Sequence, residues 1–239
     1  MSNCTFNLGR WQDQEWPAAA ALITDPPYSA RVHKGSQSHG SKYGQLAAGL
    51  EYGSITQDDA QSLADRFCQL AQDWAVIFCD HVGYSWHAEA WSAVGWYVFA
   101  PVAWVKPNAP PRFQGDGPQS AVEYLMIARP KRRPKRIGSR PGYYLAPVPG
   151  SDPHKTRGAG HKSPLALRHL VDNYTDPGDL VLDPYGGTAT MGSAAIGAGR
   201  SYQGSEVDPE MHRAGLERLR CVPSVLPGLE LRGTQADLF

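Results

Sequence analysis

An α/β fold with a mostly parallel sheet is predicted by three stretches of this sequence. Residues 19–24 form an apolar run that ends in Asp-Pro-Pro-Tyr, and a proline cannot extend a β-ladder. Residues 74–80 form a second apolar run of strand length. Residues 180–206 follow the order strand, glycine turn, small-residue helix, strand and acidic residue, which is typical of a Rossmann-like half-unit. Continuous apolar runs favour parallel strands because such strands are buried on both faces.

The composition fits one α/β domain with a small insert. The chain has 239 residues, of which 41% are hydrophobic, enough for a sizeable core. No apolar run approaches the ~20 residues of a membrane span, and the sequence lacks a signal-peptide pattern. The four cysteines are scattered without metal-binding spacing. We therefore expect a cytoplasmic protein with free thiols, no metal site and no membrane contact.

Positive charge gathers in one segment. Residues 106–168 contain thirteen Lys and Arg against three acidic residues, so this segment carries +10 and the rest of the neutral chain −10. The asymmetry suggests a polyanion partner for a basic insert over 106–160. Its densest part is predicted to be an exposed phosphate-binding loop, and a merely solvated charged face is the alternative. The basic residues of that loop are Lys131, Arg132, Arg133, Lys135 and Arg136.

The first half of the chain is expected to alternate strands and helices. Thr56 is the predicted N-cap of a helix, with Asp59 as its capping-box partner and an apolar stripe that continues through Leu70 to Trp74. The Gly- and Ser-rich segment 29–56 has little periodicity and is predicted to be a long loop of the kind that often closes over a site. The other expected elements are an edge strand at 5–7, a Trp-rich helix over about 84–96, and strands over 98–106 and 121–129.

The second half of the chain contains a clear helix start. Ser163 is the predicted N-cap of a helix that has Pro164 at its first position and that ends at Pro177-Gly178. The elements expected after it are a strand at 180–183, a small-residue helix, a strand that ends at 206, and a helix over 209–220.

The turn Asp25-Pro26-Pro27-Tyr28 follows a predicted strand at its carboxyl end, where open α/β sheets bind ligands. The Asp25 carboxylate and the freed Pro26 carbonyl offer two hydrogen-bond acceptors, and Tyr28 offers a flat ring. This set suits an exocyclic amino group on an aromatic base. An Asx-Pro turn that only caps the strand is the alternative.

The second turn has the features of a nucleotide site. Gly186 and Gly187 would let a ligand approach the backbone, and the following helix N-terminus could bind a carboxylate. Glu206 lies 23 residues after Asp183, at a strand end where an acid can accept ribose hydroxyls. A plain βαβ core without a ligand is the alternative. We expect the Asp25 turn and this glycine loop to meet in one site.

These motifs resemble those of the β group of DNA amino-methyltransferases. The turn at 25–28 matches the catalytic tetrapeptide, and residues 183–190 resemble the S-adenosylmethionine loop, in which Ala189 stands where the family usually has a second glycine. The catalytic motif precedes the cofactor motif, as in the β group. Weaker likenesses are Trp-Val-Lys-Pro-Asn at 104–108, Ala-Val-Glu-Tyr at 121–124 and His-Lys-Ser-Pro-Leu at 161–165. One departure is Asn-Leu-Gly at 7–9, which lacks the acid of the family's Asn-Gly-Asp.

The resemblance implies a Rossmann-like S-adenosylmethionine-dependent methyltransferase fold over 1–239, with target recognition in the 106–160 insert. It implies transfer of a methyl group from S-adenosylmethionine to N6 of an adenine flipped out of duplex DNA, with cytosine N4 as the alternative. The implied catalytic residues are Asp25, Pro26, Pro27 and Tyr28. The implied cofactor-binding residues are Asp183, Tyr185, Gly186, Gly187, Thr188, Thr190, Glu206, Lys162 and Ser163.

Further partners are suggested at the end of the chain and by the family. The tail 233–239 resembles a bacterial sliding-clamp motif through Gln235, Leu238 and Phe239, and packing of the tail on its own domain is the alternative. A homodimer is common in the family. A catalytically silent DNA-binding module and an RNA or protein-amide methyltransferase stay open as other functions. The resemblance implies a bacterial or phage-encoded protein that acts on the nucleoid.

Overall fold

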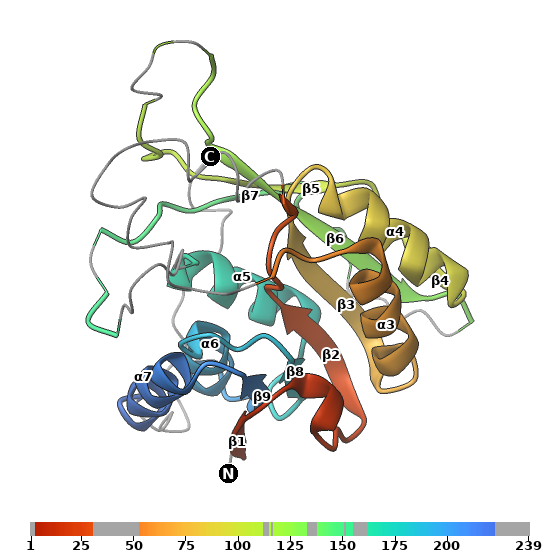
Figure 1. The fold of residues 1–239 in the computed structure, drawn as a ribbon, viewed down its shortest axis with the longest axis vertical. Helices are drawn as coiled ribbons and strands as arrows, with labels where there is room; N and C mark the ends of the chain where they lie inside the picture. The colour runs from red at the N-terminus through yellow and green to blue at the C-terminus, as the bar shows by residue number, and fades with distance from the viewer. Residues whose placement is uncertain are drawn as a thin grey trace.

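The computed structural model describes residues 3–30, 53–111, 115, 117–132, 138–150, 152–154 and 162–222. Within these ranges nine strands form one sheet (Figure 1). The strands are β1 (Cys4–Leu8), β2 (Ala19–Thr24), β3 (Ala71–Cys79), β4 (Trp96–Val98), β5 (Val102–Val105), β6 (Val122–Pro130), β7 (Tyr143–Leu145), β8 (Leu180–Asp183) and β9 (Ser201–Glu206). The helices are η1 (Trp11–Asp13), α3 (Gln57–Phe67), α4 (Gly83–Ala93), α5 (Pro164–Tyr174), α6 (Thr190–Gly197) and α7 (Pro209–Arg220).

The sheet has a parallel part and an antiparallel part. Its order is β1-β9-β8-β2-β3-β6-β5-β7, with β4 also paired to β6. The strands from β1 to β3 in this order run parallel, β6 runs antiparallel to β3, β4 and β5, and β7 is parallel to β5. The predicted α/β fold with a mostly parallel sheet is confirmed. Because β2 and β8 are parallel neighbours, their carboxyl ends lie at the same edge.

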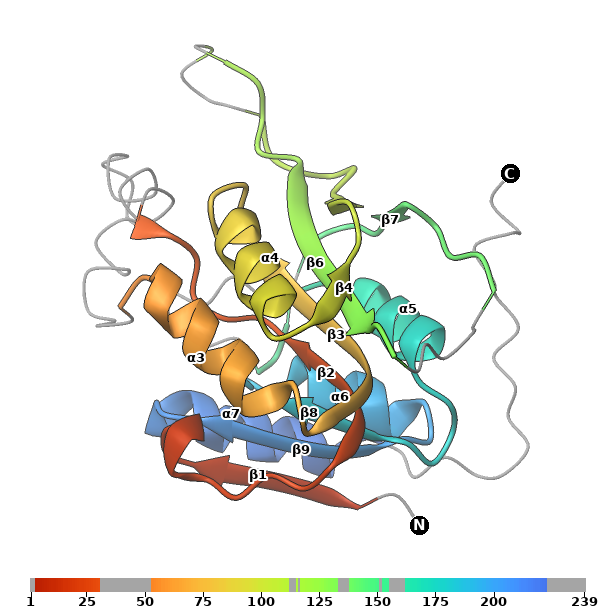
Figure 2. The same cartoon turned by 90° about the vertical axis from the view of Figure 1, so that its right-hand side faces the viewer.

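Two apolar cores cover the two faces of the sheet. Helices α3 and α4 lie on one face, and α5 and α6 lie on the other, as Figure 2 shows. The side chains of β2, β3 and β6 alternate between the two cores, so these central strands are buried on both sides. None of the helices in the described ranges has the length and apolar character that a membrane span requires.

Helix starts follow the sequence more closely than helix ends. The capping box between Thr56 and Asp59 is present, and the Ser163 side chain accepts the Ala166 N–H at the start of α5. However, α3 ends at Phe67, so the apolar stripe expected to reach Trp74 is wrong beyond that point. The strand β3 already begins at Ala71, because pairing with β2 buries the apolar run as extended chain.

Two other boundaries differ from expectation. The predicted helix over 84–96 ends at Ala93, and Gly95 then adopts a left-handed conformation with φ of 84°. The strand predicted over 98–106 is two strands, β4 and β5. Pro101 lies between them and has no N–H to donate to a ladder.

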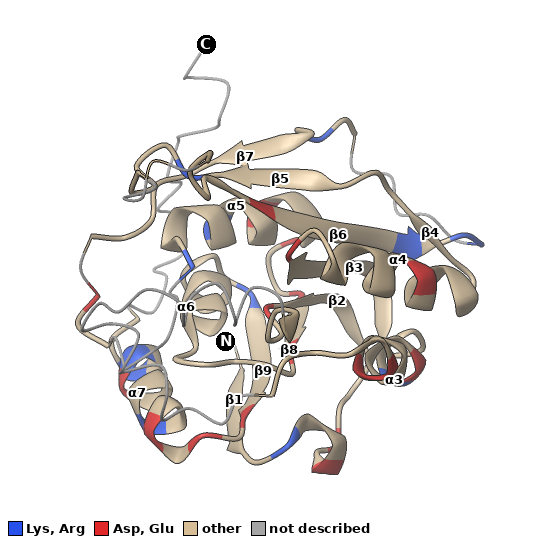
Figure 3. Cartoon of the chain, turned by 45° about the horizontal axis from the view of Figure 1, so that its top comes forward, with Lys and Arg blue, Asp and Glu red and all other residues tan. Residues whose placement is uncertain are grey.

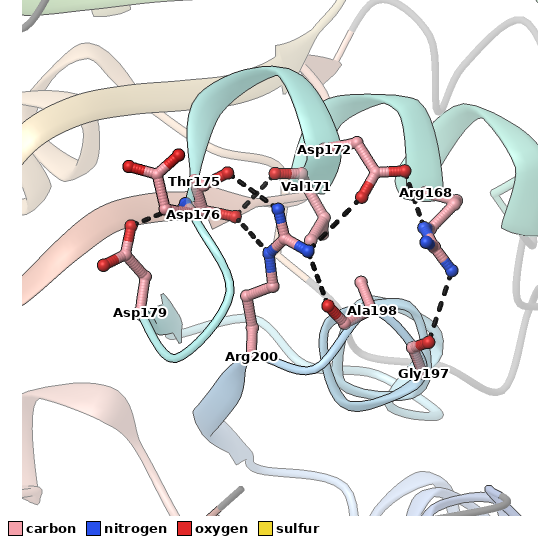
Figure 4. Close-up of polar contacts among 9 residues, drawn as sticks. All are labelled: Arg168, Val171, Asp172, Thr175, Asp176, Asp179, Gly197, Ala198 and Arg200. Carbon is pink, nitrogen blue, oxygen red and sulfur yellow. Dashed lines mark hydrogen bonds and ion pairs between the residues drawn. The ribbon is translucent and has the colours of Figure 1, made fainter. Parts of the chain in front are cut away.

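A buried arginine ties the ends of α5 and α6 together (Figure 4). Arg200 is only 6% exposed, and its guanidinium donates to the Thr175 hydroxyl at 3.0 Å and the Thr175 carbonyl at 2.8 Å. It also donates to the Ala198 carbonyl and lies 3.5 Å from Asp172. These bonds satisfy carbonyls that a helix end leaves without intrahelical partners. They fix α5 against α6, and α6 begins directly after the glycine loop.

Candidate functional site

The Asp25 turn and the glycine loop lie side by side. In the register of β2 and β8, Leu22 is opposite Leu182, so both strands end at the same level. The Thr24 hydroxyl donates to Asp183 Oδ1 at 2.7 Å and joins the two strand ends directly. Asp25 is also near enough to affect the pKa of Asp183. The expectation that the two turns meet therefore agrees with the geometry.

A partly buried charge cluster surrounds Asp25. The Lys162 ammonium lies 3.0 Å from Asp25 Oδ1 and 2.8 Å from Glu123 Oε2, and it donates to the Tyr28 hydroxyl at 2.7 Å. The Tyr28 hydroxyl in turn donates to Glu123, whose other oxygen lies 2.9 Å from Lys106 Nζ. Lys162 was expected to bind the cofactor; in the structure its ammonium contacts Asp25 and Tyr28.

Burial and ion pairs set the charges in this cluster. Burial raises the pKa of Asp25 to about 6 although its side chain keeps 30% of its accessible surface, and Lys162 opposes this rise. Burial also acts to raise the pKa of Glu123, but Lys162 and Lys106 outweigh it and lower that pKa to about 2. Burial would lower the pKa of Lys162, but Asp25 and Glu123 raise it overall. At neutral pH the cluster therefore holds two carboxylates and two ammonium groups.

The Tyr28 ring is held at its hydroxyl end. Lys162 Nζ is 2.7 Å from the hydroxyl but 4.7 Å from the ring centroid, so the ammonium lies beyond the rim and not over the face. Burial raises the pKa of Tyr28 well above its usual value, which keeps the hydroxyl protonated as a donor. The flanking Pro26 is buried, whereas Pro27 is half-buried.

Asp80, which sequence reasoning missed, fastens the residue after the tetrapeptide. Its Oδ2 accepts the Ser29 N–H at 3.0 Å and the Ser29 hydroxyl at 2.6 Å. Its Oδ1 accepts the N–H groups of Val82 and Gly83 at 3.0 and 2.6 Å, which caps α4. These bonds lower the pKa of Asp80 despite its burial. The available signal was its position directly after the apolar run of β3, the pattern shared by Asp25.

The glycine loop is shaped by close packing. A methyl group on Gly186 would lie 2.5 Å from the Phe6 ring, whereas one on Gly187 would meet nothing within 4 Å. Gly187 has φ of 54°. Ala189 has φ of 53° and is the only non-glycine residue with positive φ in the ranges that the structure describes. The methyl group of Ala189 is fully buried in the core that includes Phe6, so this departure from the family's glycine is accommodated by packing.

Two acidic residues, Asp183 and Glu206, hold the glycine loop and the strand ends beside it. Asp183 is 2% exposed and accepts from Thr24 and from the Tyr202 hydroxyl, and burial raises the pKa of Asp183 to about 7. Glu206 is 6% exposed; its carboxylate accepts the Gly187 N–H and the Asp208 N–H, both at 2.8 Å. Both acids therefore order this edge of the sheet through hydrogen bonds within the chain.

The remaining residues that were expected to bind the cofactor form hydrogen bonds within the chain or begin a helix. The Tyr185 hydroxyl accepts the Trp11 indole N–H at 3.0 Å. The Thr188 carbonyl and hydroxyl accept from the Arg218 guanidinium at 2.7 and 3.2 Å. Ser163 caps α5, and Thr190 is the first residue of α6. Asn7 of β1 lies opposite Ser205, one residue before Glu206.

The described part of the predicted basic loop lies away from Asp25. It is the exposed turn of Lys131 and Arg132 after β6, at the opposite end of that strand from Glu123. Figure 3 shows Lys and Arg in blue at the end of β6 beside β4. From Glu123 to Pro130 the strand spans roughly 24 Å at the usual rise per residue. Several predicted residues lie outside the described residues. They are the DNA contacts Arg133, Lys135 and Arg136, the clamp-binding Gln235, Leu238 and Phe239, and residues 31–52 of the predicted loop.

No group of His, Cys, Asp and Glu side chains in the described ranges could hold a metal ion. The cysteines at 4, 68, 79 and 221 are free thiols, as expected.

Comparison with known sequences identifies relatives of part of the chain. Residues 151–217 match the sequence model of the N6_N4_Mtase family, described as DNA methylase. The chain is 30% identical over 156 residues to the type II methyltransferase M.XycI of Xanthomonas campestris pv. cyanopsidis, which covers 59% of this chain and 51% of the relative. It is 40% identical over 58 residues to the DNA adenine methyltransferase YhdJ of Escherichia coli, or 24% of this chain and 20% of that protein. The chain thus spans about half the length, or less, of these curated relatives.

Solved structures share the fold over nearly the whole chain. The crystal structure of the M1.HpyAVI–SAM complex matches with a TM-score of 0.67 at 22% identity, covering 90% of this chain and 98% of that one. The cytosine-N4-specific PvuII DNA methyltransferase matches with a TM-score of 0.66 at 17% identity, covering 100% of this chain and 90% of that one.

Proposed function

We propose that this chain, whose residues 151–217 match the N6_N4_Mtase DNA methylase family, transfers a methyl group from S-adenosylmethionine to the exocyclic N6 amino group of an adenine in duplex DNA. The observation that carries the proposal is the hydrogen bond from Thr24 to Asp183, because it brings the Asp25 turn and the glycine loop to one edge of the sheet. A methyl donor held by one turn would then face a base held by the other.

The glycine loop suits S-adenosylmethionine. The open space beside Gly187 and the absence of a side-chain cap on α6 leave room and backbone donors for an amino-acid carboxylate. Glu206, at the end of β9, is placed to accept ribose hydroxyls once its bond to Gly187 opens. When bound, S-adenosylmethionine supplies an electrophilic methyl group on a sulfonium centre.

The Asp25 turn supplies the orientation of the base. An amino group conjugated with an aromatic ring is a weak nucleophile because its lone pair is delocalised. The Asp25 carboxylate and the Pro26 carbonyl would accept its two N–H bonds and favour a pyramidal nitrogen aimed at the donor. The Tyr28 ring, fixed by its hydroxyl and partly packed on the core, would stack on the base. As positive charge develops on the nitrogen, the Asp25 carboxylate stabilises it.

Adenine is favoured over cytosine by the first residue of the tetrapeptide. The family more often has Ser-Pro-Pro-Tyr with cytosine N4 and Asp-Pro-Pro-Tyr with adenine N6, and this chain has Asp25. The partial match to a protein named as a DNA adenine methyltransferase supports the same choice. Cytosine N4 is the second candidate, supported by the shared fold of a cytosine-N4-specific enzyme. In either case the base must leave the duplex to reach the Asp25 turn.

The test is a methyl-transfer assay with isotopically labelled S-adenosylmethionine and unmethylated genomic DNA, followed by digestion to nucleosides and mass spectrometry. N6-methyladenine is the expected product. N4-methylcytosine would instead select the second candidate. Transfer to RNA or protein but not to DNA, or binding of DNA with no transfer at all, would reject the proposal.

The outer parts of the chain complete this proposal. The basic insert over 106–160 would contact phosphates and read a short recognition sequence, and two copies of the chain would pair as a homodimer.

The tail would bind a sliding clamp through Gln235, Leu238 and Phe239. Deleting 235–239 should abolish clamp binding in a pull-down with purified clamp while methyl transfer continues; unchanged clamp affinity would reject the tail's role.

A further inference from the structure

The Lys162 ammonium is enclosed by groups of this chain. It donates to the Tyr28 hydroxyl and forms ion pairs with the carboxylates of Asp25 and Glu123. The rings of Phe78 and Trp104 lie 5.1 and 5.9 Å from the ammonium and exclude water from its other sides. The role of this lysine must therefore be sought at Asp25.

The two oxygens of Asp25 differ in their surroundings. Oδ1 is buried and faces Lys162 as an ion pair at 3.0 Å. The side chain nevertheless keeps 30% of its accessible surface, and because Oδ1 is buried, this surface belongs to the rest of the side chain, which includes Oδ2. Lys162 thus holds one oxygen from inside the protein and leaves the other to face outward.

We propose that Lys162 is a positioning residue for methyl transfer: anchored by Glu123, its ammonium fixes Oδ1 of an ionised Asp25 so that Oδ2 meets the amino group of the target base. This role rests on the proposed function. Glu123 acts as the anchor because it lies between two ammonium groups, those of Lys162 and Lys106, and also accepts from Tyr28. The Glu123 carboxylate thereby fixes both the Lys162 ammonium and the Tyr28 ring.

The charged groups around Asp25 predict the direction in which each substitution should shift its pKa. Lys162 favours the ionised carboxylate, whereas Glu123 on β6 disfavours it. Asp25 also interacts electrostatically with three other titratable groups: Asp183 on β8, Cys79 on β3 and Tyr28 in the same turn. Removing the positive charge of Lys162 should therefore raise the pKa of Asp25, and removing the negative charge of Glu123 should lower it.

The experiment measures single-turnover methyl transfer to unmethylated genomic DNA from pH 5 to 9 with the full chain. The wild-type rate should rise with pH around a midpoint of about 6. In Lys162→Met the midpoint should move up; a move of about two pH units would lower the rate at pH 7 about tenfold. In Glu123→Gln the midpoint should move down, and Lys162→Arg should restore part of the wild-type profile. S-adenosylmethionine affinity, measured by calorimetry, should stay within about threefold in every variant.

Arg168→Met is the matched control, because Arg168 lies on α5, which begins two residues after Lys162, in a partly exposed ion pair with Asp172, and its loss should leave the profile unchanged. Loss of S-adenosylmethionine affinity in Lys162→Met with an unmoved midpoint would overturn the proposal in favour of a cofactor role. If Lys162→Met does not fold, Glu123→Gln decides alone, and an unmoved or raised midpoint overturns the proposal. A wild-type chain with no methyl transfer to DNA at any pH would overturn the proposed function itself, and this role with it.

Discussion

The Asp25 turn and the glycine loop lie at neighbouring strand ends but are held by different forces. Around Asp25 the contacts are ion pairs and hydrogen bonds between distant parts of the chain: Tyr28 is 95 residues from Glu123 and 134 from Lys162. The glycine loop accepts and donates backbone hydrogen bonds and packs closely at Gly186, where the Phe6 ring leaves no room for a methyl group. The first site therefore depends on charge and pH, and the second on volume and backbone conformation. Four predictions separate these two dependences.

The largest effect is expected from removing the Asp25 carboxylate. Asp25→Ala should lower the rate of methyl transfer by roughly 10³-fold or more, because both the acceptor for the amino group and the charge that stabilises the transition state are lost. Asp25→Asn, which keeps the shape, should lose nearly as much. Single-turnover transfer measures the effect, and unchanged S-adenosylmethionine affinity is the control. Full activity in either variant would refute the role of Asp25.

The next effect is on stability at the charge cluster. The pKa of Glu123 is about 2 in the folded protein, below its value in an unfolded chain, so its ionised form stabilises the fold above pH ~4.3 and this contribution is lost as pH falls toward 2. Glu123→Gln should therefore lower the free energy of unfolding at pH 7 by roughly 3 kcal/mol and much less at pH 2.5. Urea unfolding at both values checks this. An equal loss at both would show that the charge of Glu123 is not what stabilises the cluster.

A pair of glycine variants tests the packing of the loop. Gly186→Ala should destabilise the protein by about 1–3 kcal/mol, because its methyl group would lie 2.5 Å from the Phe6 ring. Gly187→Ala meets no neighbour within 4 Å but keeps a φ of 54°, so about 1 kcal/mol of backbone strain is expected. Thermal unfolding and S-adenosylmethionine affinity measure both. The same loss in the two variants would mean that contact with Phe6 does not limit position 186.

The smallest effect is expected at Ala189. Ala189→Gly would relieve a left-handed conformation that costs about 1–2 kcal/mol for alanine. It would also remove a fully buried methyl group, worth about 0.8 kcal/mol, and add freedom to the unfolded chain, worth about 0.4–1 kcal/mol. These contributions nearly cancel, so the free energy of unfolding should change by less than about 1 kcal/mol. A larger loss in urea unfolding would assign the buried methyl group a greater part in holding the loop.

Both turns were recognisable in the sequence because their signals are local. Asp25 and Asp183 each follow a short apolar run and precede prolines or glycines that must leave the strand, and Ser163 with Pro164 is a self-contained helix start. The ends of α3 and α4 were less predictable. An apolar stripe such as that of Leu70 and Trp74 fits a helix or a buried strand equally well, and pairing of β3 with β2 decided between them.

The sequence by itself determined the α/β class, the two strand-end turns and their order, because backbone preferences and apolar patterning act over a few neighbouring residues. Only the tertiary structure decided that β6 runs antiparallel beside β3 and so brings Glu123 to Lys162 and Tyr28. It likewise separated the exposed Lys131 and Arg132 from Asp25 by the length of a strand. The physical reason is that a buried ion pair forms only where the packing of whole strands excludes water from both partners, and no local pattern records which strands those are.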